Sequence, residues 1–398
     1  MPRILQLSSR LPQPLDDGGR IATWNLSRCL HHNGYDLDLV CYARSDGSVE
    51  EHRGELSKAF ASVAAVAKDV ERQHPLDLAH AIITGSSYFV RKFHTRAYAK
   101  LVRERLAERR YEVTLIDGAF MGVYLPLVRA AGAAAGKVVL RAHNVEYEIL
   151  DRLAEGEPRA LYRHLLRREA AHFRRFELGL MDQADEVRTI TARDAETLAA
   201  AGVTHRVTVL NPFIDVDNYR RDPALAIEPH SIVHIGNMAW MPNRNGIQWF
   251  LREVWPQIRR QYPDCRFYVV GKNPAPGLQR LAGENVVVTG YVDDEKPYLQ
   301  RAHLLIVPLF EGSGVRIKIL TAMAMGKVSL STTIGAEGID WPGLVIRNTA
   351  DEWIAAIREA FQRAPVYSEE AIQFIRDHYD WRRRLRLEDD ERAAGSPR

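Results

Sequence analysis

One loop places glycines and an acidic residue directly before two basic residues, at a spacing that suits an anionic ligand. It occupies residues 311–314 and follows the apolar run 304–310, which predicts a strand buried on both faces. Residues 315–325 contain good helix formers and no proline, and Gly326 can end that helix before a second strand at 328–332. The stretch therefore predicts a βαβ unit with a glycine-containing loop.

The residues in and after this loop favour a sugar diphosphate as ligand. Open α/β sheets bind ligands beyond the carboxyl ends of their strands, where glycines and a helix N-terminus can surround an anion. Arg316 and Lys318 fall in the first predicted helical turn, where the helix dipole disfavours a cation by roughly 0.3–1 kcal/mol each. A diphosphate would offset that cost, and Glu311 could accept hydrogen bonds from adjacent sugar hydroxyls. A structural glycine turn with two solvated cations is the alternative.

Two further candidates follow strands of the amino-terminal half. Residues 4–8 predict a strand, and Gly18 and Gly19 then precede a helix, where they could contact a phosphate. A lone glycine pair is structural more often than not. Residues 137–140 predict another strand, which brings His143 to its carboxyl end, where α/β domains keep ligand-facing groups. A surface histidine without function is the competing interpretation.

The length of 398 residues and the alternation of strands and helices predict two Rossmann-like parallel-sheet domains. We expect an amino-terminal domain at 1–210, an interdomain linker at 211–229, a carboxyl-terminal domain at 230–365, and a helix with a frayed tail at 366–398. The tail is predicted helical over 368–386, with Tyr379 and Trp381 available to dock on a neighbouring domain. The predicted strands are 4–8, 36–42, 113–117, 137–140, 185–189 and 207–210 in the first domain, and 231–235, 266–270, 286–289, 304–310 and 328–332 in the second. The sequence reads as mostly helical over 49–110 and as helical throughout 145–181.

Composition excludes several classes of protein. Three cysteines, Cys29, Cys41 and Cys265, are far apart, which favours reduced thiols and a cytoplasmic setting. No signal-peptide pattern opens the chain, and no apolar stretch approaches 18 residues, so a secreted or membrane-spanning protein is not expected. A D-x-D pattern at 215–217 lies in the predicted linker, which cannot easily preorganise a metal site, so we predict no metal ion.

Positive charge is concentrated in two predicted helices. Residues 86–110 carry eight basic and two acidic residues, and residues 159–175 carry six basic and one acidic residue. Basic helices can lie on anionic membrane surfaces or meet anionic acceptors, although a solvated face is the simpler interpretation. No aromatic residues interleave with these charges in a recognisable module, so we do not expect nucleic-acid binding.

Taken together, these features resemble the retaining GT-B glycosyltransferases, and in particular the large family 4 type, the glycosyl transferases group 1. That family includes sucrose synthases and the mannosyl- and N-acetylglucosaminyltransferases of bacterial envelope assembly. The resemblance covers nearly the whole chain and is strongest over 292–338. The matching residues stand in the family's order and are Gly290, Tyr291, Pro308, Glu311, Gly312, Ala322, Met323, Ala324 and Gly326.

The resemblance implies two domains that face across a cleft, a carboxyl-terminal helix that packs back toward the amino-terminal domain, and a nucleotide-sugar donor. By that resemblance Gly19 would approach the donor phosphates and His143 would touch the donor sugar. Arg316 and Lys318 would hold the diphosphate, and Glu311 would bind the transferred sugar. The full donor-binding set that we predict is Gly18, Gly19, Gly236, Asn237, Arg244, Gly312, Ser313, Gly314 and Thr321.

The implied reaction retains configuration at the anomeric carbon. A leaving-group phosphate oxygen can take the acceptor's proton on the same face, so neither a separate base, nor a divalent metal, nor a cofactor is expected. Stabilisation of the departing diphosphate would then be the main catalytic contribution. A UDP-sugar is the favoured donor, and a glycan or lipid-linked acceptor in envelope or exopolysaccharide assembly is the favoured partner, on the cytoplasmic face of the membrane.

The chain departs from the family pattern at two positions and in one length. The family's second Glu, which grips the nucleotide ribose, is Thr321 here, and its Arg after the first carboxyl-domain strand is Asn237, with Arg244 the nearest basic residue. The loop before Thr321 is also longer. We infer that Arg316 and Lys318, which the longer loop introduces, take over the diphosphate.

These departures keep other functions open. The first alternative is a catalytically weak or inactive sugar-nucleotide-binding partner subunit of a transferase. A sugar-nucleotide 2-epimerase would need acidic groups on both sides of the sugar C2, and only Glu311 and Glu337 are candidates. A nicotinamide dehydrogenase ranks lowest, because no G-x-G-x-x-G follows the first strand.

Overall fold

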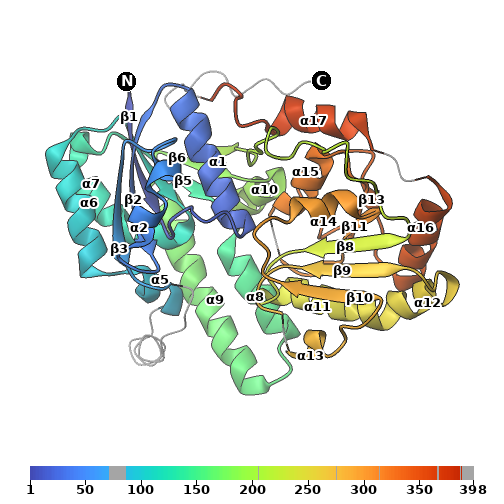
Figure 1. Ribbon diagram of the computed structural model, residues 1–398. Coiled ribbons are helices and arrows are strands. Elements are labelled where there is room, and N and C mark those ends of the chain that lie inside the picture. Colours follow the sequence, from blue (N-terminus) through green and yellow to red (C-terminus); the bar gives the residue numbers. More distant parts are fainter. Residues whose placement is uncertain are drawn as a thin grey trace. The chain divides into compact units, whose positions relative to one another are not determined.

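The computed structural model describes residues 1–70, 87–204, 206–274, 276–312, 314–364, 367–385 and 387. The chain divides into two compact units, one of residues 1–212 with 382–398 and one of residues 213–381. Each unit is built around its own parallel sheet, with helices on both faces (Figure 1). The predicted α/β class with two Rossmann-like domains is therefore confirmed.

The first unit contains a seven-stranded sheet in the order β3-β2-β1-β4-β5-β6-β7, in which the paired strands run parallel. Its strands are β1 (Arg3–Ser8), β2 (Asp36–Ala43), β3 (Ser62–Ala67), β4 (Val113–Asp117), β5 (Lys137–Ala142), β6 (Glu186–Thr189) and β7 (Val207–Val209). Its helices are α1 (Gly18–His32), α2 (Ser48–Glu51), α3 (Arg53–Leu56), α5 (Tyr88–Phe93), α6 (Arg96–Glu108), α7 (Leu125–Ala130), α8 (Glu146–Gly156), α9 (Ala160–Met181) and α10 (Ala192–Ala200). The strand order reverses between β1 and β4, which makes their carboxyl ends the expected place for a ligand.

The second unit contains a six-stranded parallel sheet in the order β10-β9-β8-β11-β12-β13. Its strands are β8 (Ser231–Ile235), β9 (Arg266–Val270), β10 (Val286–Gly290), β11 (Leu304–Val307), β12 (Ser329–Ser331) and β13 (Val345–Ile346). Its helices are α11 (Met241–Trp249), α12 (Trp255–Gln261), α13 (Pro276–Gln279), α14 (Lys296–Arg301), α15 (Ile317–Ala324), α16 (Ala350–Gln362) and α17 (Glu369–Tyr379). Here the order reverses between β8 and β11.

The long amphipathic pattern after β8 forms a nearly continuous helical rod that covers one face of this sheet. A π-helical turn, Phe250–Val254, joins α11 to α12. Ile247, Phe250 and Ile258 pack with Trp353 of α16 against strand residues such as Phe267. The apolar face predicted from the 3.6-residue period is thus buried on the sheet.

Two stretches that the sequence predicts as helical are not continuous helices in the structure. Residues 62–67 lie within the stretch predicted as mostly helical but form β3, because this alanine-rich segment pairs in register with β2 at the edge of the sheet. The rest of that prediction falls partly on residues 71–86, outside the described residues. The predicted helix 145–181 is two helices, since the segment Glu157–Arg159 contains Pro158, whose ring disfavours a continuous helix.

The end of the chain also differs from the predicted helix 368–386. Helix α17 ends at Tyr379 and packs on α15 of its own unit, and Asp380 then pairs with Ile214 in an isolated parallel bridge. The Trp381 indole donates to Asp215, also within the second unit. It is the segment after α17 that belongs to the first unit, where Leu385 N donates to Asn33. Of the predicted linker, residues 213–229 pack with the second unit.

Candidate active site

The carboxyl ends of β8 and β11 meet at the reversal of strand order in the second unit. Gly236 follows β8 directly, and residues 308–316 connect β11 to α15. Helix α11 is held close to the same edge, because an added Cβ at Gly246 would lie 2.0 Å from Pro308 O. The fold therefore brings together the end of β8, the start of α11 and the predicted diphosphate loop, which lie far apart in the sequence.

Gly236 leaves the space that a cationic side chain occupies. Its φ is +155°, and a Cβ at this position would lie 2.6 Å from Asn243 Nδ2 and 2.8 Å from Lys318 Nζ. The backbone also approaches Gly271 closely, where a Cβ would be 2.0 Å from Gly236 O. Gly236 is thus required by conformation and by its neighbours, and it places the Lys318 ammonium beside the end of β8.

Lys318 lies in the first turn of α15 and is held by two side chains of other elements. Its Nζ is 2.8 Å from Asn243 Oδ1 of α11 and 3.5 Å from Nε2 of His234 in β8. Burial, followed by the charge of Arg316, lowers the pKa of Lys318 to about 7, although Glu295 acts in the opposite direction. The predicted cation is therefore present at the carboxyl ends of β8 and β11, and its protonation depends on burial and on the neighbouring charges.

His234 is fully buried behind Lys318 and is held neutral. Its Nδ1 lies 3.0 Å from Ile306 O, and because a carbonyl only accepts, Nδ1 carries the proton and Nε2 is left as an acceptor. Burial first, and then the charge of Lys318, lower the pKa of His234 well below its ordinary value. The neutral imidazole thus offers a lone pair to the lysine.

Arg316 stands at the N-cap of α15, one residue before the helix, and not within its first turn as predicted. Its φ of −85° and ψ of 96° are extended, so the helix starts at Ile317. Arg316 is 7% exposed, and its guanidinium lies over the Trp240 ring, with Cζ 5.3 Å from the ring centroid. A Cβ at Gly312, where φ is +101°, would be 3.0 Å from Arg316 Nη2. The loop thus folds closely around this second cation.

Glu311 and the neighbouring loop positions face the amino end of α11. Asn245 Nδ2 donates to Glu311 Oε1 at 2.7 Å, and the Glu311 side chain remains half-buried. Gly314 has a φ of +82°, so both loop glycines, Gly312 and Gly314, adopt the left-handed region. Ser313 lies outside the described residues. The predicted sugar-binding carboxylate is therefore anchored but still partly accessible.

The two positions at which the chain departs from the family pattern, and the nearby Arg244, have distinct surroundings. Thr321 is 2% exposed and its Oγ1 donates to Lys318 O in its own helix, so a ribose contact would have to replace that bond. Asn237 Oδ1 accepts from Ala239 N at 3.0 Å and from the Asn273 side chain at 3.1 Å. Arg244 is half-buried on α11, and its side chain has no ion pair or hydrogen bond with the residues that the structure describes.

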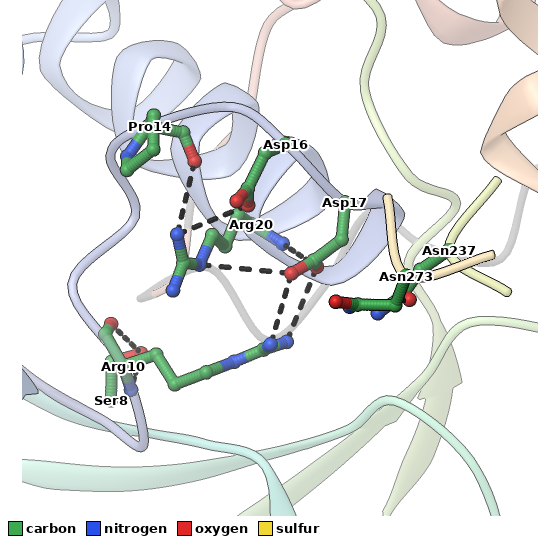
Figure 2. Close-up of polar contacts among 8 residues, drawn as sticks. All are labelled: Ser8, Arg10, Pro14, Asp16, Asp17, Arg20, Asn237 and Asn273. Carbon is green, nitrogen blue, oxygen red and sulfur yellow. Dashed lines mark hydrogen bonds and ion pairs between the residues drawn. The ribbon is translucent and has the colours of Figure 1, made fainter. Parts of the chain in front are cut away.

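The first unit offers a charged loop at the start of α1. Gly18 and Gly19 are the first residues of that helix, and Asp17 caps it by accepting from Arg20 N at 3.0 Å. Arg10 binds Asp17 through both terminal nitrogens, at 3.0 and 3.3 Å, and Arg20 also reaches Asp16 at 3.0 Å (Figure 2). A carboxylate therefore already occupies the N-terminus that the glycine pair was expected to offer to a phosphate.

His143 lies after the carboxyl end of β5 and is bound to a buried carboxylate. Its Nε2 is 2.6 Å from Asp117 Oδ1, and the imidazole side chain is 22% exposed. Burial alone would raise the pKa of Asp117, but the charges of His143 and Arg141 and the hydrogen bonds from His143 and Thr23 hold it well below its ordinary range. An ionised carboxylate only accepts, so His143 Nε2 carries a proton toward Asp117.

Sequence reasoning missed four residues around these sites: Asp117, His234, Trp240 and Asn243. Asp117 ends a predicted strand that neighbours the His143 strand, which is a signal that could have found it. His234 is a polar residue inside an apolar strand, another usable signal. Asn243 and Trp240 have no sequence signal, because their contacts depend on where α11 packs.

Within the described residues, no group of three or more His, Cys, Asp or Glu side chains could hold a metal ion. No helix in the described part of the chain is both long and apolar enough to cross a membrane. Each unit therefore has its own candidate site: cations, glycines and one carboxylate in the second unit, and a histidine with its carboxylate partner in the first.

The fold defines the class of protein. The chain has the architecture of GT-B glycosyltransferases, as its similarity to solved structures shows. It matches the sucrose-phosphate synthase of Thermosynechococcus elongatus with a TM-score of 0.69 and 14% identity, covering 96% of each chain. It matches HepE of Anabaena, solved in complex with UDP-glucose, with a TM-score of 0.63 and 14% identity, covering 95% of this chain and 96% of that chain.

Residues 229–363 match the family model described as Glycosyl transferases group 1, which places the candidate diphosphate loop inside the family's domain. An uncharacterized 44.6 kDa protein in the cps region of Klebsiella pneumoniae is 22% identical over 349 residues, which is 85% of this chain and 84% of that protein. The family match and the fold together support a glycosyltransferase activity.

Proposed function

We propose that the protein is a retaining, metal-independent glycosyltransferase that moves a sugar from a UDP-sugar to a glycan or lipid-linked acceptor in envelope or exopolysaccharide assembly. The observation that carries the proposal is the pair of cations, Arg316 and Lys318, beside glycine-rich backbone at the carboxyl ends of β8 and β11. A diphosphate leaving group would bring negative charge to these two cations. The HepE complex with UDP-glucose makes UDP-sugars the first donors to test.

In this proposal each residue has a defined task. Arg316 and Lys318 stabilise the charge that develops on the departing diphosphate, and Glu311 accepts from hydroxyls of the transferred sugar. His143, oriented by Asp117, contacts the donor sugar. The departing phosphate oxygen accepts the acceptor's proton on the same face, so the anomeric configuration is retained.

The first experiment is a thermal-shift screen against UDP-, GDP- and ADP-sugars, with and without EDTA. A ligand at 100 times its dissociation constant adds about 2.7 kcal/mol of stability, which moves the midpoint by several degrees. We expect a shift with UDP-sugars that EDTA does not change. A shift that EDTA abolishes would contradict metal independence, and the anomeric configuration of the product, read by NMR, tests retention.

Turnover of Arg316→Ala tests the role of the cations. Removing a main charge stabiliser should lower turnover by about 100- to 1,000-fold. Arg252→Ala is the matched control, since Arg252 is an exposed arginine of the same unit paired with Glu253. A loss smaller than tenfold for Arg316→Ala would remove that residue from the proposed mechanism.

A second function is favoured by two observations. The Thr321 hydroxyl is bonded within its own helix, and Asn237 stands where the family has an arginine, which suits a partner subunit that binds a sugar nucleotide with little or no catalysis. Donor binding without hydrolysis or transfer, measured on the same protein sample, would favour this alternative over the transferase.

The lipid-linked acceptor is suggested by the exposed face of α9. This face combines apolar residues near the amino end of the helix with several arginines. Its exposed residues are Leu161, Tyr162, Arg167, Arg168, Arg174 and Arg175. Such a helix can lie on an anionic bilayer at the cytoplasmic face. Sedimentation with phosphatidylserine vesicles at low salt should capture the protein, and Leu161→Glu should weaken capture, whereas Ile346→Glu, at another exposed apolar residue, should not.

A further inference from the structure

Lys318, Asn243 and His234 form a network for which the proposed mechanism gives no reason. A phosphate-binding lysine needs no buried imidazole behind it, yet His234 is fully buried, neutral and aimed at Lys318 Nζ. Asn243 is also buried, and it is oriented by donating its own Nδ2 to Asn237 O at 3.0 Å, which leaves Oδ1 for the lysine. Both partners therefore present acceptors that are fixed by other contacts.

Resting on the proposed function, we propose that binding of the donor diphosphate is coupled to uptake of one proton by Lys318, with Asn243 and His234 as the positioning residues that hold the resulting ammonium. The proton comes from solvent and converts the neutral amine to an ammonium, so no other reactant is required. The coupling makes donor affinity dependent on pH in the neutral range.

The charges around Lys318 explain why the free site disfavours an ammonium. Arg316, one residue before α15, is a second cation close by, and His234 lies in an apolar strand without a carboxylate partner. Among the described residues, Glu295, beside α14, is the one acidic group that acts on Lys318, and burial raises its own pKa as well. A diphosphate would add negative charge where these elements supply little, so it would favour the ammonium.

The neutral acceptors explain why the ammonium, once formed, has defined partners. Ile306 O fixes the His234 tautomer, so Nε2 accepts from Lys318 in either ligand state. Asn243 Oδ1 accepts a second proton of the ammonium at 2.8 Å. The remaining N–H is then available to the phosphate oxygens, and the side chain need not reorganise when the donor binds.

The expected size follows from the pKa of about 7 for Lys318 in the free protein. If the bound lysine stays protonated, uptake is about 0.9 proton per donor at pH 8 and about 0.1 at pH 6, and the dissociation constant rises about tenfold between these pH values. UDP-glucose is the suitable probe, because it lacks the terminal phosphate ionisation near pH 6 that UDP would contribute.

Calorimetry with UDP-glucose in buffers of different ionisation enthalpy measures the protons taken up. We expect close to one proton at pH 8. Asn243→Asp places a carboxylate against the lysine, keeps it charged in the free protein and should reduce uptake at pH 8 toward zero. His234→Leu removes an acceptor and should move the pH at which affinity falls to lower values, opposite to Asn243→Asp.

Asn218→Asp is the matched control, because Asn218 also contacts a lysine, Lys296 Nζ, at 3.0 Å, outside the candidate site. It should leave proton uptake unchanged. UDP-glucose binding at pH 8 without proton uptake would overturn the coupling and leave the transferase proposal standing. Absence of binding at millimolar UDP-, GDP- and ADP-glucose would overturn both. Equal shifts by Asn243→Asp and its control would reject Asn243 as a positioning residue.

Discussion

Replacing Asp117 should separate structural from functional roles in the first unit most clearly. Its two oxygens accept four hydrogen bonds, and the side chain is completely buried. The four donors and their distances are Gln6 Nε2 at 3.2 Å, Thr23 Oγ1 at 2.9 Å, Arg141 Nη1 at 3.1 Å and His143 Nε2 at 2.6 Å. Asp117→Asn keeps the shape and removes the charge.

The cost of this substitution is set mainly by Arg141. Its side chain is 1% exposed, and Asp117 is its one ion-pair partner among the residues that the structure describes. Breaking a buried ion pair by removing one partner typically costs about 3–5 kcal/mol. For a unit of roughly 200 residues this corresponds to a midpoint lowered by roughly 6–20 °C, at about 2–4 °C per kcal/mol.

The functional effect arises from His143. The carboxylate requires a proton on Nε2, whereas an asparagine can either accept or donate, so the imidazole would lose its fixed tautomer and orientation. We expect kcat/KM with a UDP-sugar to fall about tenfold or more under conditions in which the variant is still folded. His143→Ala should lower activity similarly but leave most of the stability, because the ion pair with Arg141 remains.

Thermal unfolding followed by circular dichroism, with initial rates measured 15 °C below the observed midpoint of each variant, tests both effects. Glu50→Gln is the control, because Glu50 pairs with Arg53 on the surface of the same unit and should leave the midpoint unchanged. Asp117→Asn with a midpoint as high as the wild type would refute the argument from the buried charge. Full activity in a folded Asp117→Asn protein would refute the argument from tautomer control.

Three further predictions concern other parts of the chain. Gly236→Ala should cost about 1–2 kcal/mol of stability and raise the donor KM, because its Cβ would meet Lys318 and the backbone has a φ of +155°. Gly283→Ala is the control, because an added Cβ there would lie in open space. Equal donor KM values for the two variants would contradict the predicted clash with Lys318. Burial raises the pKa of Glu146 to about 7. Burial and the charge of Glu146 raise the pKa of Glu177 to about 8. The stability that this pair contributes is therefore fully present below about pH 4.3 and is lost as pH rises through 7 to 8. Glu146→Gln should flatten urea midpoints between pH 6 and 9, and an unchanged slope would dismiss the pair as the cause. Thr321→Val should leave donor affinity within about twofold, since the hydroxyl is bonded inside its own helix; a larger loss in calorimetry would establish a ribose contact.

Much of the fold follows from local sequence patterns. Short apolar runs bounded by turn residues predicted β1, β4, β8, β9 and β11 within a few residues, because a strand buried on both faces must be continuously apolar. Gly326, with a φ of +69°, ends α15 as expected, since glycine adopts this conformation at little cost. Strand β3 was missed because alanine-rich sequence carries no strand signal and its pairing with β2 is decided by the sheet.

The residues of the candidate sites were also predicted only in part from the sequence. The sequence by itself determined the glycine loop, its two cations, Glu311 and the histidine after β5, because glycine and charged residues at strand ends are visible as local patterns. Only the tertiary structure decided which partners those residues have. It placed Asn243 and His234 against Lys318, Asp117 against His143 and a carboxylate at the N-terminus of α1. The contacts of Lys318 and His143 join residues 26 to 84 positions apart, so they depend on strand order and helix packing that no local pattern encodes.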